Sequence, residues 1–441
     1  MKNPIVKKIF YNIDNIAVAL CFSLIYLQHI CIMLKANSIA SKMFTILFVI
    51  VVLWFAFCVA RDLIFMKKKP KDFKLKSKTI PLILCASVLF FSLFAVLTDV
   101  LVNTKSIPLN LDYYRKLLIF MEVVFFLYSC YSGFFSKLTV NILLSENLFF
   151  SLITILLFLI GKTRTWHGFV PGNLLSLNFA NSNTAGIVLC INISLIFYTI
   201  VAVKKIYFKL PLIPVLIFLI VLLYMTKCRN AYLATFLFVI CIFVAPKLFS
   251  LNKTFSILFV VLLPIIVSSL YLIFFTIKSG GYYVDNQIAA SGKTSGTRYG
   301  IWINAFSNIN LIPFVSSYFA SSDGMVEPFQ WHNTGIDVIV AFGFVSYALL
   351  IAYLFSMNYF SFIRKQGDKR FGIYFGFFVV VFSLGIFEAF PFFSANGIAL
   401  LSFSYLVISK VNFKGKMLCS EESYKTPQIP LQFESYLEVT I

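Results

Sequence analysis

Long uninterrupted apolar runs are the feature that most constrains how this chain can fold. A bilayer is crossed by about 20 apolar residues in one helix, whereas barrel strands are much shorter, and lipid leaves no water for unpaired backbone groups. We therefore predict an all-α, polytopic integral membrane protein with about twelve transmembrane helices. The predicted spans are 13–34, 43–60, 79–102, 117–136, 138–160, 184–203, 210–225, 231–246, 254–275, 333–355, 372–390 and 393–409.

Composition excludes an ordinary soluble protein. The 441-residue chain is 60% hydrophobic and only 12% charged, against about 45–50% and about 25% in soluble domains. Its 37 Lys and Arg outnumber 17 Asp and Glu, which in a soluble chain would suggest a nucleic-acid partner. With a cytoplasmic N-terminus, 25 of the 37 basic residues fall on the cytoplasmic side, as the positive-inside rule requires. We expect both termini in the cytoplasm and no nucleic acid.

The spans divide the chain into a helical transmembrane domain, 1–410, and a polar cytoplasmic tail, 411–441. Residues 276–332 form the longest polar stretch before the tail, and this topology places them outside the membrane as a loop before the tenth helix. Long loops in compact proteins are uncommon and often functional. We therefore expect 276–332 to be the active-site loop.

Arg229 is the most informative single charge. It lies in a minimal outer turn, Thr226-Lys227-Cys228-Arg229-Asn230, between two apolar spans. At the start of a helix, a guanidinium and unpaired backbone N–H groups together form an anion site. The alternative is a charge that only snorkels to the interface. Arg298 and Arg164 also lie on the outer side.

Other candidates for chemistry gather on the same side. All three histidines map there, namely His29, His167 and His332. Four acidic residues fall toward the outer halves of their spans, namely Asp99, Glu122, Asp337 and Glu388. Acidic residues within spans are usually functional or paired. The sequence therefore suggests an outer cavity lined by Arg, His and carboxylate, with structural helix–helix pairs as the alternative. The nine cysteines show no C-x-x-C spacing, which argues against a zinc site or a disulfide framework.

Four motifs follow one another across about residues 160–350. They are Arg164…Gly168-Phe169…Asn183-Thr184-Ala185-Gly186, Thr226-Lys227-Cys228-Arg229-Asn230-Ala231, Arg298-Tyr299-Gly300-Ile301-Trp302, and His332-Asn333 followed after nine residues by Gly343. Their order resembles the bacterial O-antigen ligase and O-antigen/capsular polysaccharide polymerase family. The chain departs from the family pattern at Cys228 and Asn230, where the family has Ser and Gly, and at Ser346, where the family favours Gly, Thr or Tyr.

The resemblance implies a glycosyltransferase that acts on the extracytoplasmic face of the bacterial inner membrane, without cofactor or metal. Its donor is a glycan on undecaprenyl pyrophosphate. His332 would be the catalytic residue at the acceptor hydroxyl, and the donor pyrophosphate would bind Arg229, Arg298 and Arg164. The residues that would support the site or bind substrate are Asn183, Trp302, Asn333 and Glu388.

We expect a polymerase that joins lipid-linked repeat units into O-antigen or capsule. Its partners would be the lipid-linked oligosaccharide, a glycan acceptor, membrane lipid and a chain-length regulator. One alternative is a ligase that transfers finished glycan to lipid A core, wall or protein. The alternative from another class is a transporter or flippase of lipid-linked glycans. The spans are nearly free of Lys and Arg, which disfavours a transporter with a basic central cavity.

Overall fold

The computed structural model describes residues 4–66, 73–103, 111–167, 174–203, 205–279, 301–302, 305–306, 309, 312–316, 332–365, 368, 370–393 and 397–411. Most of the predicted loop 276–332, including Arg298, and nearly all of the predicted tail 411–441 lie outside the described residues.

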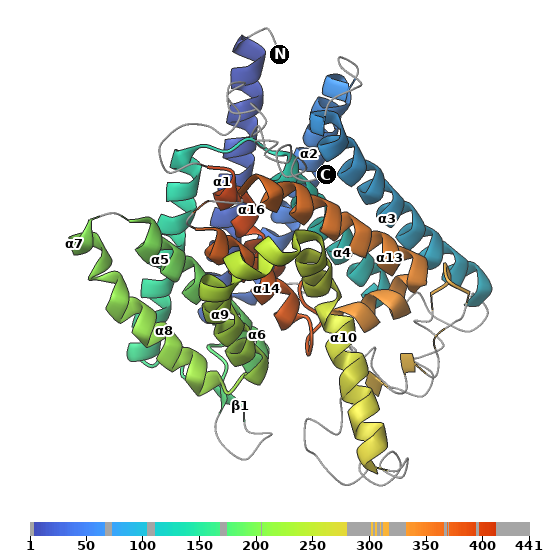
Figure 1. Ribbon diagram of the computed structural model, residues 1–441. Helices are drawn as coiled ribbons and strands as arrows, with labels where there is room; N and C mark the ends of the chain where they lie inside the picture. Colours follow the sequence, from blue (N-terminus) through green and yellow to red (C-terminus); the bar gives the residue numbers. More distant parts are fainter. Residues whose placement is uncertain are drawn as a thin grey trace, which may run out of the picture.

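The described chain is helical almost throughout (Figure 1). A two-stranded antiparallel ribbon pairs β1 (Trp166–His167) with β2 (Leu174–Leu175). The short helices are α7 (Ile206–Lys209), the 3-10 helix η1 (Ile363–Lys365), α15 (Ile398–Ser402) and α16 (Ser404–Ser409). The long helices are α1 (Pro4–Met33), α2 (Asn37–Met66), α3 (Phe73–Asn103), α4 (Leu111–Ser132), α5 (Lys137–Leu159), α6 (Ser182–Ala202), α8 (Leu212–Thr226), α9 (Arg229–Leu251), α10 (Lys253–Ser279), α13 (Thr334–Phe362) and α14 (Phe371–Leu384).

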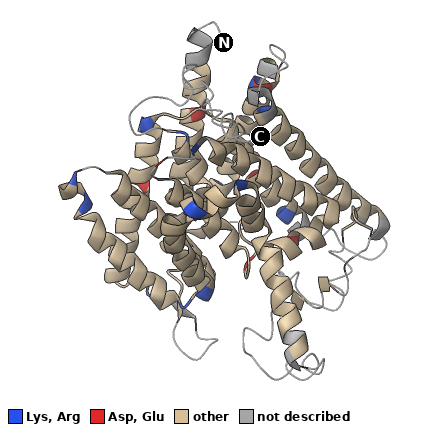
Figure 2. Ribbon diagram, in the orientation of Figure 1, with Lys and Arg blue, Asp and Glu red and all other residues tan. Residues whose placement is uncertain are grey.

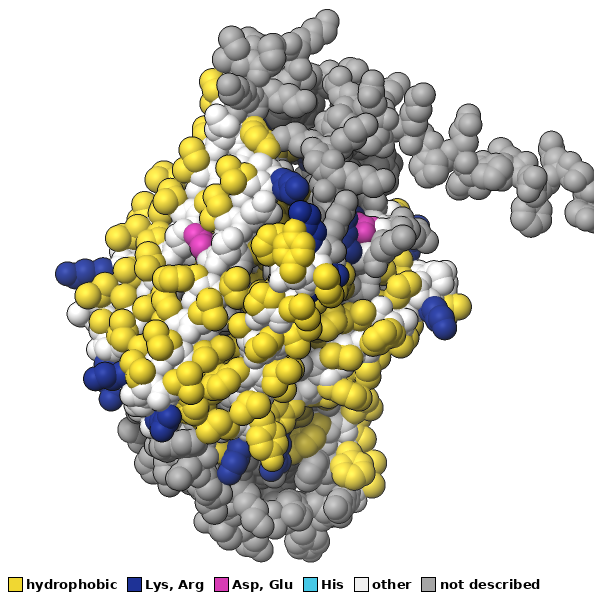
Figure 3. All heavy atoms as spheres, turned by 90° about the vertical axis from the view of Figure 1, so that its left-hand side faces the viewer, with side chains coloured by type: hydrophobic (Ala, Val, Ile, Leu, Met, Phe, Trp, Pro, Cys, Tyr) yellow, Lys and Arg dark blue, Asp and Glu magenta, His cyan; other side chains and the backbone are white. Residues whose placement is uncertain are grey.

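The predicted class, an all-α multi-pass membrane protein, is confirmed. Within the described residues, nine helices are long and apolar enough to cross a membrane: α1, α2, α3, α5, α6, α7 with α8, α9, α10 and α13. Large apolar side chains cover the face formed by α5, α7 and α8 (Figure 3), and most charged residues lie near helix ends (Figure 2). An apolar surface of this extent is the surface that lipid covers.

The predicted count of twelve spans is not reproduced. Residues 117–132 of the predicted span 117–136 lie in α4, which also carries charged residues such as Lys116 and Glu122. The predicted span 372–390 corresponds to α14, which ends at Leu384, and 393–409 corresponds to the two short helices α15 and α16. Apolar composition alone does not distinguish a helix that faces lipid from a helix that other helices enclose, because both are built from apolar residues.

Helix α14 is the clearest enclosed helix, and it lies at the centre of the bundle (Figure 1). All of its residues are buried, and it packs chiefly against α9. Two glycines allow this close approach, since a Cβ at Gly372 would lie 2.7 Å from the Ile242 carbonyl oxygen and one at Gly376 2.8 Å from the Phe238 ring. Its 14 residues span about 21 Å, less than a hydrocarbon core of about 30 Å. The helix therefore ends inside the protein.

The chain continues from α14 as a buried, non-helical segment, 385–393. Irregular backbone at membrane depth is tolerated where it is buried in protein or lines a water-filled cavity. This segment approaches the start of α13, where the Thr334 N–H donates to the Gly385 carbonyl oxygen at 3.0 Å. It brings Glu388 into the interior of the bundle.

Candidate functional site

His332 and Glu388 form the centre of the site. His332 Nδ1 lies 3.2 Å from Glu388 Oε2, and the two side chains are 31% and 11% exposed. His332 also adopts a left-handed backbone conformation, with φ of 51°. Such strain in a residue other than glycine is concentrated at functional sites, where the surrounding structure holds it. The pair is accessible on the histidine side and enclosed on the carboxylate side.

A second side chain holds the other oxygen of Glu388. Asn183 Nδ2 donates to Glu388 Oε1 at 2.7 Å. Asn183 lies in the first turn of α6, just after the N-cap residue Asn181. Each oxygen of the carboxylate therefore has a partner from a different part of the chain.

Asn333 fixes the backbone on which His332 sits. It is the N-cap of α13, and its Oδ1 accepts from the Ile336 N–H at 3.0 Å. Its Nδ2 donates to the carbonyl oxygens of Pro264 at 3.0 Å and Ile386 at 2.8 Å, and the residue is fully buried. Asn333 thus ties α13 to α10 and to the segment that carries Glu388. The geometry gives it a supporting role.

The Arg229 turn lies against the same groups. Lys227 is left-handed, with φ of 52°, and α9 begins at the exposed residue Arg229. The Cys228 thiol lies 3.9 Å from the Asn183 carbonyl oxygen, and Asn230 Nδ2 donates to the Leu384 carbonyl oxygen at 2.6 Å. The turn is thereby held between the start of α6 and the end of α14, beside the segment that carries Glu388.

Three helix N-termini converge here, those of α6, α9 and α13. The first turn of a helix carries partial positive charge and directs N–H groups outward. Asn181 and Asn333 cap α6 and α13 with their side chains, whereas the N-cap residue of α9, Cys228, forms no such bond. With exposed Lys227 and Arg229 beside it, the α9 N-terminus is suited to bind a phosphate.

Trp302 has a structural position. It is fully buried, and its ring stacks on Phe387 with centroids 5.9 Å apart and planes at 15°. Tyr271 of α10 meets the same indole edge-on at 5.5 Å. Because Phe387 directly precedes Glu388, the indole supports the backbone of that carboxylate. Its full burial leaves it no face on which a sugar could stack.

Arg164 follows α5 in the chain and binds the C-terminal end of that helix. Its Nε donates to the Phe158 carbonyl oxygen at 2.9 Å and its Nη2 to the Leu159 carbonyl oxygen at 3.0 Å. The guanidinium also lies 5.2 Å from the Phe158 ring centroid. Arginine at a helix C-terminus stabilises the last carbonyl groups. The structure does not bring Arg164 into contact with His332 or Glu388.

Among the other sequence candidates, His29 is buried against Phe150 and Phe179, with ring centroids 5.8 Å apart in each case. Asp337 Oδ2 accepts from the Asn333 N–H at 3.4 Å. Within the described residues, no three metal-ligating side chains come together. The cluster offers proton transfer and anion binding as its chemistry.

Gly186 ends the first of the four motifs, but the sequence predicted no role for it. A Cβ at this position would lie 2.5 Å from the Cys228 Cβ, so only glycine allows the Arg229 turn to pack on α6 this closely. The Asn-x-x-Gly spacing from Asn183 is the one signal that could have identified it.

None of the known family models matches this chain, and no curated protein is significantly similar to it in sequence. The resemblance to the O-antigen ligase and polymerase family therefore stays a prediction from motif order.

Proposed function

We propose that this chain is an extracytoplasmic membrane glycosyltransferase that polymerises oligosaccharide repeat units carried on undecaprenyl pyrophosphate. The observation that carries the proposal is the His332–Glu388 pair beside the N-terminus of α9, where Arg229 is exposed. A base and an anion site next to each other are what a transfer from a pyrophosphate to a hydroxyl requires. Surface polysaccharide, as O-antigen or capsule, would be the product.

The reaction follows from these two parts. The acceptor hydroxyl loses its proton to His332 Nε2, while Nδ1–H stays bound to Glu388. The acceptor oxygen attacks the anomeric carbon of the donor, and the bond from that carbon to the pyrophosphate oxygen breaks. A positioned general base contributes about 10²- to 10⁴-fold to such a step.

The leaving pyrophosphate gains negative charge as this bond breaks. Arg229 and the first-turn N–H groups of α9 would stabilise that charge, with Arg298 as a further candidate. Donors aimed at developing charge are effective because they need no reorganisation during the reaction, and one such donor is typically worth about 10²- to 10³-fold. The helix end and the guanidinium together supply this chemistry without a metal ion.

The transporter alternative is less well supported. Arg61 is fully buried, but Asp14 and Asp62 compensate its charge. A basic residue paired in this way is not available to a passing pyrophosphate. The exposed basic residues Lys227 and Arg229 instead lie at one end of their helices.

The proposal is tested with the full-length protein in proteoliposomes that contain undecaprenyl-pyrophosphate-linked repeat units from its own host. We expect His332→Ala to lower the rate of product formation at least about 10²-fold. Arg229→Lys keeps the charge but loses the planar fork, and we expect it to weaken use of the donor. The control is Lys209→Ala at the end of α7, which should retain activity. Full activity of His332→Ala would refute the assignment.

The same assay separates polymerase from ligase. A polymerase forms a ladder of longer lipid-linked chains from repeat units alone, because one unit is donor and the next is acceptor. A ligase leaves these units unchanged until lipid A core or another acceptor is added. Activity that appears only after such an addition would replace polymerase with ligase while leaving the proposed chemistry in place.

A further inference from the structure

We infer that Asn183 is a positioning residue that connects the Arg229 turn with the His332–Glu388 pair, and so aligns donor binding with proton removal. The inference rests on the proposed function and deepens it. Asn183 touches both halves of the site, one through its side chain and one through its backbone.

The side chain sets the orientation of Glu388. Asn183 Nδ2 donates to Oε1 at 2.7 Å, and His332 Nδ1 meets Oε2 at 3.2 Å. An amide N–H₂ can only donate, so the bond requires a carboxylate oxygen that accepts. Free rotation of the carboxylate would break both contacts at once. By holding Oε1, Asn183 therefore keeps Oε2 in place for His332 Nδ1. With Nδ1 held by Glu388, the imidazole directs Nε2 toward the substrate.

The backbone sets the position of the Arg229 turn. The Cys228 thiol lies 3.9 Å from the Asn183 carbonyl oxygen, and Gly186, one turn further along α6, packs directly under Cys228. A Cβ at Gly186 would lie 2.5 Å from the Cys228 Cβ and 2.9 Å from its Sγ. The start of α6 thus acts as the surface on which the first residues of α9 rest.

A capping role does not explain the Asn183 side chain. The N-terminus of α6 is capped by Asn181, whose Oδ1 accepts from the Thr184 N–H at 2.8 Å. The Asn183 amide instead crosses to a residue 205 positions away in the sequence. Its side chain is therefore available to orient Glu388.

The two contacts predict different kinetic effects. Loss of the Asn183 amide should lower kcat and leave the KM for donor nearly unchanged, because the Arg229 turn keeps its backbone support. Gly186→Ala should do the opposite and raise the KM for donor, since the added methyl group pushes the turn away from α6. A residue that only fills space would show neither pattern.

The experiment measures initial rates against donor concentration in the proteoliposome assay. Asn183→Asp keeps the shape of the side chain but replaces the donor amide with an acceptor that repels Glu388. We expect kcat to fall about tenfold or more, because a hydrogen bond to a charged group is lost. Asn183→Ala should also lose activity, and Thr184→Val, one residue along the same turn, should not. Wild-type kcat in Asn183→Asp would refute the inference.

A double variant adds a test that general damage to the fold cannot mimic. In Asn183→Asp combined with Glu388→Gln, the donor and acceptor exchange places, so the bond between the two positions can re-form. We expect this double variant to be more active than the product of the two single effects predicts. A double variant whose activity equals the product of the two single effects would count against the inference.

Failure of the inference and failure of the proposed function can be told apart. If His332→Ala and Arg229→Ala lose activity while the Asn183 variants do not, Asn183 has no positioning role and the proposed function stands. If the wild-type protein transfers no glycan from lipid-linked repeats, both are overturned.

Discussion

At the scale of single residues, His332 combines a chemical role with an unfavourable backbone. A φ of 51° costs a residue with a Cβ about 1–2 kcal/mol, whereas glycine adopts it freely. We therefore expect His332→Gly to be more stable than His332→Ala by about 1 kcal/mol, although both lose the imidazole. Thermal unfolding of the two purified variants in the same detergent measures the difference. Equal stability, or a more stable His332→Ala, would show that the left-handed conformation is not held in solution.

The sequence identified residues of the site, but it did not show which other residues each of them contacts. His332, Glu388 and Asn183 were all candidates, and they meet although up to 205 residues separate them. Trp302 and Arg164 were candidates too, but one is buried under Phe387 and the other binds the end of α5. A sequence shows that a residue lies at a helix end or on a loop. It does not show the rotation of that helix, and rotation decides whether the side chain faces substrate, lipid or a neighbouring helix.

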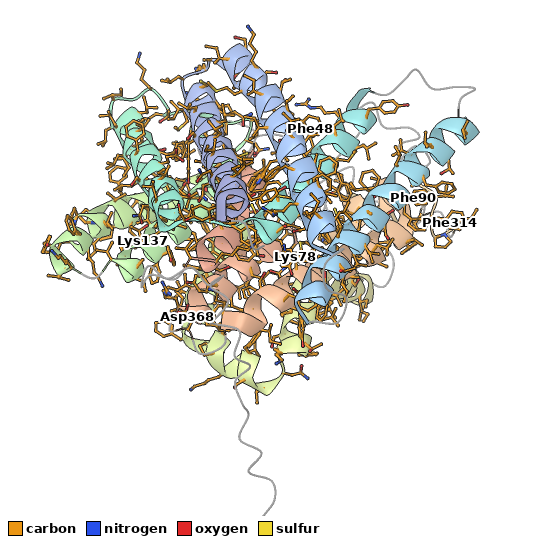
Figure 4. All side chains as sticks on the ribbon, turned by 90° about the horizontal axis from the view of Figure 1, so that it is seen from above. Phe48, Lys78, Phe90, Lys137, Phe314 and Asp368 are labelled. Atoms are coloured by element: carbon orange, nitrogen blue, oxygen red, sulfur yellow. The ribbon has the colours of Figure 1, made fainter. Side chains whose placement is uncertain are left out.

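At the scale of elements, α13 is two helical segments joined at Gly343, whose φ and ψ are 81° and 170°. The Val345 N–H leaves the helical pattern and donates to the Pro313 carbonyl oxygen at 2.8 Å. Residues 312–316 pack into this break and against α3, where the Phe314 and Phe94 rings lie 6.0 Å apart. Figure 4 shows Phe314 beside α3. The sequence predicted one continuous span, 333–355, because a glycine in an apolar run does not by itself reveal a break.

We expect Gly343→Ala to destabilise the protein by about 1–3 kcal/mol, the cost of a strained backbone region. An added Cβ would also lie 2.9 Å from the Pro313 carbonyl oxygen, so residues 312–316 would have to move. Gly161→Ala is a matched control, because Gly161 has nearly the same φ of 80° with no atom within 4 Å of an added Cβ. Both variants suffer backbone strain, and only Gly343→Ala adds the clash. A thermal unfolding midpoint for Gly343→Ala no lower than that of Gly161→Ala would contradict this account.

At the scale of the whole molecule, the end opposite the site is held by buried charged residues that the sequence did not identify as partners. Arg61 Nη2 donates to the Ser132 carbonyl oxygen at 2.9 Å, and Arg61 also pairs with Asp14. Tyr128 donates to Asp62 at 3.0 Å. These bonds join α1, α2 and α4. A buried charge that loses its partner is strongly destabilising, so this network keeps the helices in one arrangement. Net charge by segment indicates membrane sidedness, but not which basic residues are buried.

Membrane sidedness is the whole-molecule property on which the proposed function depends, because lipid-linked repeats are presented on the extracytoplasmic face. Lys227 is exposed in the Arg229 turn, and Lys162 is exposed just after α5. Lys209 is half-buried at the end of α7, which precedes α8, and Lys247 is exposed in the last turns of α9. Single cysteines at these positions, in a background without the native cysteines, can be labelled with a membrane-impermeant thiol reagent. We expect Lys162→Cys and Lys227→Cys to react from outside intact spheroplasts. Lys209→Cys and Lys247→Cys should react only after permeabilisation, since the excess of basic residues holds their side in the cytoplasm. The reverse pattern would place His332 and Arg229 in the cytoplasm, where this donor is not presented, and would overturn the topology and the proposed reaction together.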